Sequence, residues 1–462
     1  MAKIILPHNF IPRKYQQLLW SYMETKEGEK PIPEGEGGKR AVAVWHRRAG
    51  KDVLAINLVA TKVFERVGVY WHLLPTYKQG RAIVWNGFTR EGRKFLDHFP
   101  REIVKPGGKN KTEMSVEFIN GSRYQVVGTD DVDSLVGTNP VGVIFSEYSL
   151  QDPGAWNYLR PILAENGGWA LFIYTMRGKN HGYQMLEMAR KNTKWFHQVL
   201  VAGDAGTQRD DGTPVISDRQ IQDERESGMP EEMIQQEFFC SADAPLAGAY
   251  YGAQMTRLDS LHRITTVAWE PRLPVDTSWD LGIDDEMVVW FFQDYSGEVR
   301  VIDHVKLSGE SLLYFIRILR GRVDGYERMG DYEYRNHFAP HDIEVRELGT
   351  GKSRIQVAKE HGLKFTVVHK HEVEDRIEVV RQSLPMCWFD TDRCDRGVQA
   401  LKSYRKEWDE KNKCYRSRPL HDWSSHDADA FGIYFMGRRR RLMGEKRGKQ
   451  DRVVDDHDYL RA

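Results

Sequence analysis

The chain has 462 residues, enough for two domains that each bury a core. Hydrophobic residues make up 40% and charged residues 29%, and 67 Lys and Arg balance 67 Asp and Glu, so no overall basic field points to nucleic acid. No apolar run reaches membrane-spanning length, the N-terminus lacks a signal-peptide pattern, and the four cysteines form no C-x-x-C pair. Composition therefore predicts a cytosolic protein with neither a disulfide framework nor a zinc knuckle.

A strand, a basic turn and a helix follow one another between residues 41 and 66. The apolar run 41–45 predicts a buried strand, the turn ends in Gly50-Lys51, and apolar residues at helical spacing predict a helix at 53–66. This is the context of a phosphate-binding loop, in which backbone N–H groups and a lysine face the anion. The match to G-x-x-x-x-G-K-[ST] is imperfect, because Trp45 replaces the first Gly and Asp52 replaces Ser or Thr. An ordinary basic turn is the alternative.

A second Gly-Lys pair, in the sequence Gly-Thr-Gly-Lys-Ser at 349–353, matches the letters of the P-loop pattern more closely. The residues before it, 342–347, alternate charged with apolar side chains, which a buried strand feeding a phosphate loop does not do. We interpret this segment as a surface turn.

Apolar strands alternate with helical segments through the N-terminal part. Further strands are predicted at 69–74, 115–119, 122–127, 141–145 and 170–174, with Asn120-Gly121 as a hairpin turn and a helical segment from 77 to about 97. Polar residues follow several of the strands. This order predicts a parallel α/β sheet with its site at the carboxyl edge.

Ser146 and Glu147 end the strand at 141–145. A P-loop ATPase keeps a water-activating carboxylate at the Glu147 position, but the residue before it is usually Asp. Here the loop carries a carboxylate (Asp52) where a hydroxyl is usual, and the strand carries a hydroxyl (Ser146) where a carboxylate is usual. Because Mg²⁺ accepts oxygen ligands of both kinds, the exchange can preserve its coordination shell.

The C-terminal part has a different order of elements. Strands at 275–282, 287–293 and 299–305 come first, and the elements that follow are a helix at 310–320, a strand at 336–339, a helix at 353–361, a strand at 364–368, and helices at 372–384 and 395–408. Three consecutive strands followed by alternating helix and strand is the order of an RNase H-like fold.

Acidic residues fall at the ends of the first and fourth strands (Asp280, Asp342) and in the last helix (Asp429). Three converging carboxylates can hold two divalent ions about 4 Å apart for phosphodiester hydrolysis. Asp427 and Asp429 are two residues apart on a helix and cannot share a face. We choose Asp429, with His426 as a neighbour that orients a metal or phosphate, and keep Asp427, Asp303 and Asp284 as second choices.

Several segments together resemble the large terminase subunit of tailed bacteriophages, which packages viral DNA. These segments are Tyr15-Gln16, 47–52, 74–79, 143–147 and 175–181. The last is similar to the family's coupling motif, although Met176 stands where Pro is common. Loop 130–137 carries Val136 where relatives often have Arg, so the resemblance assigns no trans arginine finger.

The resemblance implies an N-terminal P-loop (ASCE-type) ATPase joined to a C-terminal RNase H-like nuclease, with ATP and Mg²⁺ or Mn²⁺ as cofactors. The implied catalytic residues are Glu147, Asp280, Asp342 and Asp429, and the last three are the metal ligands. The nucleotide-binding residues are Gln16, which can read adenine, and Arg47, Arg48, Gly50, Lys51, Asp52, Ser146, Thr175 and Asn180. Arg47 matches an arginine directed at the γ-phosphate.

The expected domains are an ATPase domain (1–205), a linker subdomain (206–272), a nuclease domain (273–437) and a basic, flexible tail (438–462). Expected partners are double-stranded DNA, a small terminase subunit, the portal protein of the procapsid and further copies of this chain in a ring. The expected location is the host cytoplasm, docked transiently on the procapsid and outside any membrane. The alternatives are a helicase-nuclease of repair or restriction and a non-enzymatic DNA-binding scaffold.

Overall fold

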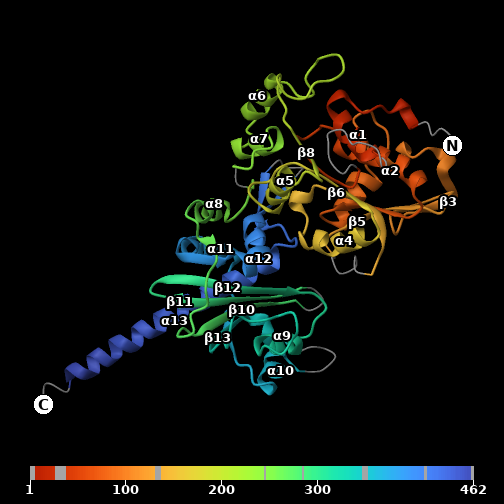
Figure 1. The fold of residues 1–462 in the computed structure, drawn as a ribbon. Helices are drawn as coiled ribbons and strands as arrows, with labels where there is room; N and C mark the ends of the chain where they lie inside the picture. Colours follow the sequence, from red (N-terminus) through yellow and green to blue (C-terminus); the bar gives the residue numbers. More distant parts are fainter. Residues whose placement is uncertain are drawn as a thin grey trace. The chain divides into compact units, whose positions relative to one another are not determined.

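The computed structural model describes residues 6–25, 38–130, 137–243, 246–282, 286–345, 352–409 and 414–458. It divides into two compact units, Met1–Ala247 and Gly248–Ala462, which are described separately (Figure 1). The finer division into four segments that the sequence suggests remains a proposal. No described helix combines the length and apolar character needed to cross a membrane.

Unit 1 is built on one eight-stranded sheet with the order β3-β4-β5-β2-β6-β7-β1-β8. Neighbours from β5 to β8 in this order run parallel, and the β3-β4 and β4-β5 pairs are antiparallel. The strands are β1 (Arg40–Trp45), β2 (Val69–Leu74), β3 (Val104–Asn110), β4 (Ser115–Phe118), β5 (Arg123–Gly128), β6 (Pro140–Ser146), β7 (Trp169–Tyr174) and β8 (Phe196–Leu200). The predicted parallel α/β sheet is confirmed, with an antiparallel hairpin added at one edge.

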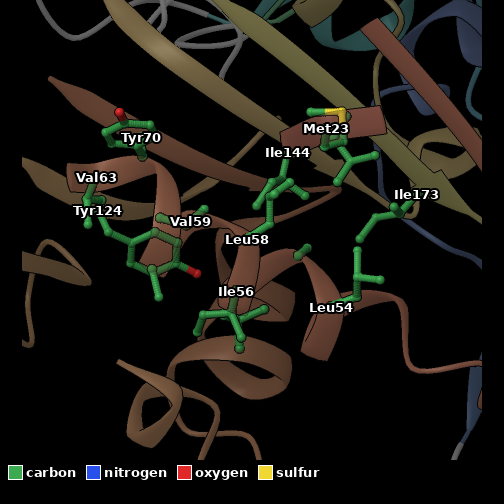
Figure 2. Packing of buried hydrophobic residues seen from close by; sticks show 14 of the residues in the cluster. Met23, Leu54, Ile56, Leu58, Val59, Val63, Tyr70, Tyr124, Ile144 and Ile173 are labelled. Atoms are coloured by element: carbon green, nitrogen blue, oxygen red, sulfur yellow. The ribbon is translucent and has the colours of Figure 1, made fainter. Parts of the chain in front are cut away.

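Helices cover both faces of this sheet. The helices are α1 (Gln17–Glu24), α2 (Lys51–Glu65), α3 (Tyr77–Gly80), α4 (Gly154–Glu165), α5 (His181–Lys191), α6 (Asp218–Glu226) and α7 (Glu231–Glu237). On one face α1 and α2 pack on alternate strand residues such as Ile144 and Ile173 (Figure 2), and on the other α4 and α5 pack on Phe145 and Phe172. A sheet buried on both faces explains why its central strands are continuous apolar runs.

Unit 2 contains a seven-stranded sheet with the order β14-β13-β10-β11-β12-β15-β9. The strands are β9 (Ile264–Thr265), β10 (Val275–Leu281), β11 (Met287–Tyr295), β12 (Glu298–Leu307), β13 (Tyr334–Pro340), β14 (Phe365–Val368) and β15 (Cys387–Asp390), and β16 (Lys406–Asp409) with β17 (Cys414–Pro419) forms a separate hairpin. The strands β10, β11 and β12 are antiparallel neighbours, and β13 and β14 add in parallel beside β10. This confirms the RNase H-like arrangement.

Helices also cover both faces of the second sheet. The helices are α8 (Gly252–Ser260), α9 (Leu312–Leu319), α10 (Arg354–Glu360), α11 (Val373–Ser383), α12 (Thr391–Ser403) and α13 (Ser425–Asp458). One core joins α11, α12 and α13 to alternate strand residues such as Trp290 and Phe292, and another joins α9 and α10 to Trp279 and Phe291.

Several local expectations differ from the structure. The helical segment expected to reach residue 97 ends at Trp85, and at Gly87 the chain passes so close to Ile83 O that an added Cβ would lie 1.7 Å from it. Strands that include β3, β8 and β15 lie where no strand was expected, and α12 ends at Ser403 rather than 408. Residues 131–136 and 346–351, which include Val136 and most of the second Gly-Lys-Ser sequence, lie outside the described residues.

The basic run 438–441 also differs from the expected flexible tail. Arg438 and Arg441 lie on α13 and are largely buried, with exposed side-chain fractions of 14% and 16%. Arg438 Nε donates to Asp294 Oδ1 at 2.7 Å, and Arg441 donates to Asp276 Oδ2 at 2.7 Å and also to Asp294. These two arginines therefore join the helix to the sheet, whereas Arg439 and Arg440 are exposed.

Candidate active sites

The turn between β1 and α2 has the geometry of an anion-binding loop. Gly50 adopts φ 80° and ψ 31°, and Arg48 adopts φ 74°, so the chain reverses sharply before the helix begins at Lys51. A side chain at Gly50 would be strained by this φ and would lie 3.1 Å from Gln16 Nε2. The loop thus brings backbone N–H groups to the start of α2, the arrangement that phosphate binding uses.

Lys51 contacts residues at the carboxyl ends of three parallel strands. Its buried Nζ donates to Trp45 O at 3.0 Å and to Thr175 Oγ1 at 2.9 Å, and it lies 3.6 Å from Glu147 Oε1. Lys51, Thr175 and Glu147, which were chosen from the sequence, are thus neighbours. The lysine is held in place by oxygen atoms of the protein.

Asp52 and Ser146 are in direct contact. Ser146 Oγ donates to Asp52 Oδ1 at 2.6 Å, and His72 Nε2 lies 3.2 Å from the same oxygen. Burial raises the pKa of Asp52, but the bonds from His72 and Ser146 and the nearby Lys51 outweigh burial, so the pKa lies below its usual value. The carboxyl is therefore ionised, as a cation ligand must be.

Glu147 follows β6 in a left-handed conformation, with φ 56°. Its N–H donates to Ile173 O at 2.7 Å, which fixes the backbone against β7. Oε2 is buried and has no hydrogen-bond partner among the described residues. An unpartnered carboxylate oxygen beside Lys51 is suited to accept a hydrogen bond from a water molecule.

Arg47 shares a carboxylate with a residue that the sequence did not single out. Glu237 on α7 lies 2.7 Å from Arg177 NH2 and 3.6 Å from Arg47 NH1, and its carbonyl accepts from Arg47 N at 2.8 Å. Glu237 and Arg177 are buried, whereas Arg47 is half exposed, with an exposed side-chain fraction of 53%. Glu237 carried no local sequence signal, because its role depends on the placement of α7 about 190 residues after the loop.

The side chains of the remaining residues predicted to bind nucleotide form no hydrogen bond with Lys51, Asp52 or Glu147 in the described part of the chain. Gln16 Nε2 donates to Ala49 O at 2.8 Å, and its Oε1 accepts from Arg13 N at 3.1 Å, so both ends of the amide are bonded within the protein. Asn180 caps α5, accepting from Gly182 N at 2.9 Å and donating to Ser149 O at 2.8 Å. Arg48 is exposed.

In unit 2, Asp280, Asp342 and Asp429 are near enough for their charges to interact. Burial raises the pKa of Asp342 and of Asp429, and the Asp280 carboxylate raises both further. His426 Nδ1 lies 2.7 Å from Asp280 Oδ2. Asp280 is therefore close enough to both Asp342 and Asp429 for its charge to act on them, an arrangement that a bound cation would stabilise.

Asp429 is held by cationic and hydroxyl groups. Arg376 NH2 donates to its Oδ1, and Tyr404 OH lies 3.4 Å from the same oxygen. Among the described residues, no three His, Cys, Asp or Glu side chains are arranged to hold a metal ion as they stand. Binding a metal ion here would therefore require these side chains to rearrange.

Asp427 faces away from the other carboxylates. It is completely buried, with Oδ1 2.6 Å from His304 Nε2 and Oδ2 3.0 Å from Lys306 Nζ. Burial opposes ionisation, but Lys306 and His304 outweigh it and hold the pKa of Asp427 well below its usual value. Asp427 is thus part of an internal ion network.

Asp303 and Asp284 are the other alternative metal ligands. Asp303 lies 3.1 Å from Arg393 NH1, and burial raises its pKa to about 6. Asp284 lies outside the described residues.

The residues present fit the expected cofactors in chemistry. Asp52 and Ser146 offer hard oxygen ligands beside a buried lysine, which suits Mg²⁺ with a nucleotide, and the carboxylates of unit 2 suit Mg²⁺ or Mn²⁺. When bound, such ions polarise phosphate oxygens and activate water. Lys51 would hold a phosphate group, Glu147 would accept a proton or orient a water, and His426 would orient Asp280.

A parallel sheet with a Gly-Lys loop, joined in one chain to a unit with the strand order of an RNase H-like fold, defines the fold class as a P-loop-type α/β unit followed by an RNase H-like unit. No protein-family model matches the chain. Among characterised proteins, it is 26% identical over 170 residues to the terminase large subunit of Thermus phage G20c, covering 32% of this chain and 33% of that protein. The terminase large subunit of Thermus virus P23-45 matches equally, so the similarity spans about a third of these relatives.

Solved structures similar to the chain include the large terminase of a thermophilic bacteriophage in complex with ADP. That pair is 16% identical with a TM-score of 0.39, covering 92% of this chain and 98% of the other. The nuclease of the phage G20c large terminase with bound cobalt has 11% identity and a TM-score of 0.29 over 41% of this chain and 98% of that one. The resemblance to large terminase subunits that the motifs predict is confirmed by the names of the relatives.

Proposed function

We propose that this chain is a DNA-packaging motor subunit of a tailed bacteriophage, which uses ATP to move double-stranded DNA into a procapsid and cuts concatemeric DNA with divalent metal ions. The observation that carries the ATPase part is Lys51, buried and bonded to Thr175 Oγ1 at 2.9 Å, with Glu147 3.6 Å away. These are the groups that phosphoryl transfer needs: a phosphate-binding cation, a sensor and a water-orienting carboxylate.

In this proposal ATP and Mg²⁺ bind at the loop. The lysine and the α2 N-terminus hold the phosphates, Asp52 and Ser146 bind the cation, and Glu147 orients water. Arg47 is exposed enough to reach a γ-phosphate, and Gln16 supports the loop from behind through Ala49. Arg48, Gly50, Thr175 and Asn180 complete the nucleotide site.

The nuclease part rests on Asp280, Asp342 and Asp429, with two Mg²⁺ or Mn²⁺ ions as the proposed cofactors. The closeness of Asp280 to both Asp342 and Asp429 supports this assignment, because a cation relieves the repulsion between neighbouring carboxylates. The proposed partners are DNA, a small terminase subunit and the portal of the procapsid, with several copies of the chain in a ring in the host cytoplasm.

One experiment tests both activities. Purified protein is mixed with plasmid DNA, with and without Mn²⁺ and ATP, and scored for cutting and for phosphate release. We expect Lys51→Ala to abolish phosphate release and spare cutting, and Asp280→Asn to abolish cutting and spare phosphate release. Asp331→Asn is the matched control, because Asp331 is a fully exposed aspartate in the same unit as Asp280. Loss of both activities in either active-site variant would contradict the assignment of two sites.

A further inference from the structure

A buried chain of side chains leads away from the proposed cation ligands into the sheet. His72 lies on β2, between β5 and β6, and is completely buried. Its Nδ1 lies 2.9 Å from Tyr124 OH on β5, and its Nε2 lies 3.2 Å from Asp52 Oδ1 at the start of α2. Neither His72 nor Tyr124 belongs to a recognised loop motif.

The hydrogen-bond roles along this chain follow from what a carboxylate that binds a cation can do. A carboxylate only accepts, so Ser146 Oγ and His72 Nε2 both donate to Oδ1. On the other side of the ring, Nδ1 is paired with the buried Tyr124 hydroxyl, 2.9 Å away. Tyr124 has an exposed fraction of 0%, so water does not compete for this bond.

Both donors use the same oxygen of Asp52. Among the described residues, no hydrogen bond or ion pair reaches Oδ2, and the side chain retains an exposed fraction of 19%. The result is a carboxylate with one oxygen fixed by the protein and the other without a hydrogen bond among the described residues. Hydrogen bonds to a ligating carboxylate are a recurring means of orienting a metal ligand.

Resting on the proposed ATPase function, we propose that His72, held by Tyr124, is a positioning residue that orients Asp52 toward the divalent cation bound with the nucleotide. His72 touches neither nucleotide nor cation. It acts through Asp52, and Tyr124 acts through His72. Asp52 stands where a hydroxyl is usual, and a carboxylate can rotate and bind a cation in several ways. A hydrogen bond that fixes its orientation is therefore useful here.

The test measures cation binding directly. A fluorescent, non-hydrolysable ATP analogue is titrated with and without Mg²⁺, and bound Mn²⁺ is measured by electron paramagnetic resonance in the presence of the analogue. We expect His72→Leu to weaken Mn²⁺ binding about 10- to 100-fold, as losses of such supporting groups do elsewhere, and to leave analogue binding without metal within about twofold. His72→Gln, whose amide can still donate to Asp52, should recover most of the loss.

Tyr124→Phe removes one oxygen and keeps the aromatic packing. It should weaken Mn²⁺ binding several-fold. If His72→Leu fails to fold, Tyr124→Phe still tests whether the chain of side chains orients Asp52. Tyr70→Phe is the matched control, because Tyr70 pairs with Tyr124 across the strands, is equally buried, and has its hydroxyl within hydrogen-bond distance of Lys62 O and Arg66 O instead.

The outcomes separate this inference from the proposed function. Wild-type protein that binds no nucleotide analogue would contradict the ATPase proposal itself. Wild-type protein with metal-dependent binding, together with folded His72→Leu or Tyr124→Phe variants whose Mn²⁺ affinity equals that of wild type, would overturn the role of His72 alone.

Discussion

Glu237 and Arg177 form an ion pair of 2.7 Å in which both side chains are largely buried. Arg47, from the loop, lies 3.6 Å from the same carboxylate. Burial raises the pKa of Glu237, but Arg177 and Arg47 outweigh it and lower the pKa below its usual value. Helix α7 thereby supplies the counter-charge for two arginines that flank the loop.

We expect Glu237→Gln to destabilise unit 1 by about 3 kcal/mol, because Arg177 stays buried without its principal counter-charge. The variant should also bind ATP more tightly, since Arg47 no longer has a competing carboxylate. Urea unfolding and ATP titration measure the two effects. Glu231→Gln on the same helix is the control, because Glu231 is half exposed and should change stability by less than about 1 kcal/mol. Equal stabilities of the two variants would contradict this interpretation.

The contact of 2.6 Å between Ser146 Oγ and Asp52 Oδ1 makes a double-mutant cycle decisive. Asp52→Ser and Ser146→Asp should each lower ATP turnover by about tenfold or more, which corresponds to ~1.4 kcal/mol of lost transition-state stabilisation. The double variant restores the usual order of carboxylate and hydroxyl and should recover activity beyond the sum of the single changes. Strictly additive losses would mean that the two residues do not share a cation.

Asp427 and Asp429 should differ in their effect on DNA cutting. Asp427→Asn removes one of the two carboxylates that neighbour buried Lys306, the other being Glu286, and should cost about 1–3 kcal/mol of unfolding free energy without abolishing cutting by the folded protein. Asp429→Asn removes a proposed metal ligand and the counter-charge of Arg376, so it should abolish DNA cutting and lower stability with no loss of ATP hydrolysis. Thermal unfolding and plasmid cleavage measured on both variants distinguish these roles.

Acid should reveal the Asp427 network as well. Because the folded pKa of Asp427 is depressed, its contribution to stability is fully present above the unfolded pKa of ~3.9 and is lost as pH falls toward the folded pKa. The difference in unfolding free energy between wild type and Asp427→Asn should therefore shrink as pH falls below about 4. A difference between the two proteins that does not depend on pH would show that the carboxylate is not ionised.

The four arginines of the run 438–441 should divide into two pairs. Arg438→Ala with Arg441→Ala should lower the unfolding free energy by about 1–3 kcal/mol, because Asp276 and Asp294 lose buried partners. Arg439→Ala with Arg440→Ala should leave stability unchanged. If the exposed pair contacts DNA phosphates, the slope of log affinity against log salt should fall by roughly one for each lost contact. Equal effects on stability for the two pairs would contradict the division.

The sequence predicts the two sheets well, because buried parallel strands are continuous apolar runs and the strand ends carry polar residues. Lys51, Thr175, Glu147, Asp52 and Ser146 meet for that reason: each lies at the same edge of one sheet. The nuclease ligands remain predictions. That Asp280 and Asp342 lie near each other could be expected, because each ends a strand of the same sheet.

Other features could not be foreseen because they depend on packing between distant elements. In the sequence His72 is one polar residue inside an apolar strand, and Glu237 is one of several acidic residues on a polar helix. Arg438 and Arg441 belong to a run of four arginines, and composition alone cannot separate the two that pair with Asp294 and Asp276. Strand β15 was missed because it has only four residues between two helices.

The ion pairs of Arg438 and Arg441 also fix the rotational phase of α13. A helix turns by about 100° per residue, so the face that Asp429 presents is determined by where the arginines downstream are anchored. Inserting one residue between Asp429 and Arg438 would force either the two arginines or Asp429 out of position by about that angle. The spacing between Asp429 and the two arginines is therefore as constrained as the residues themselves. Changes of length in this part of the helix should be tolerated far less than substitutions on its exposed side.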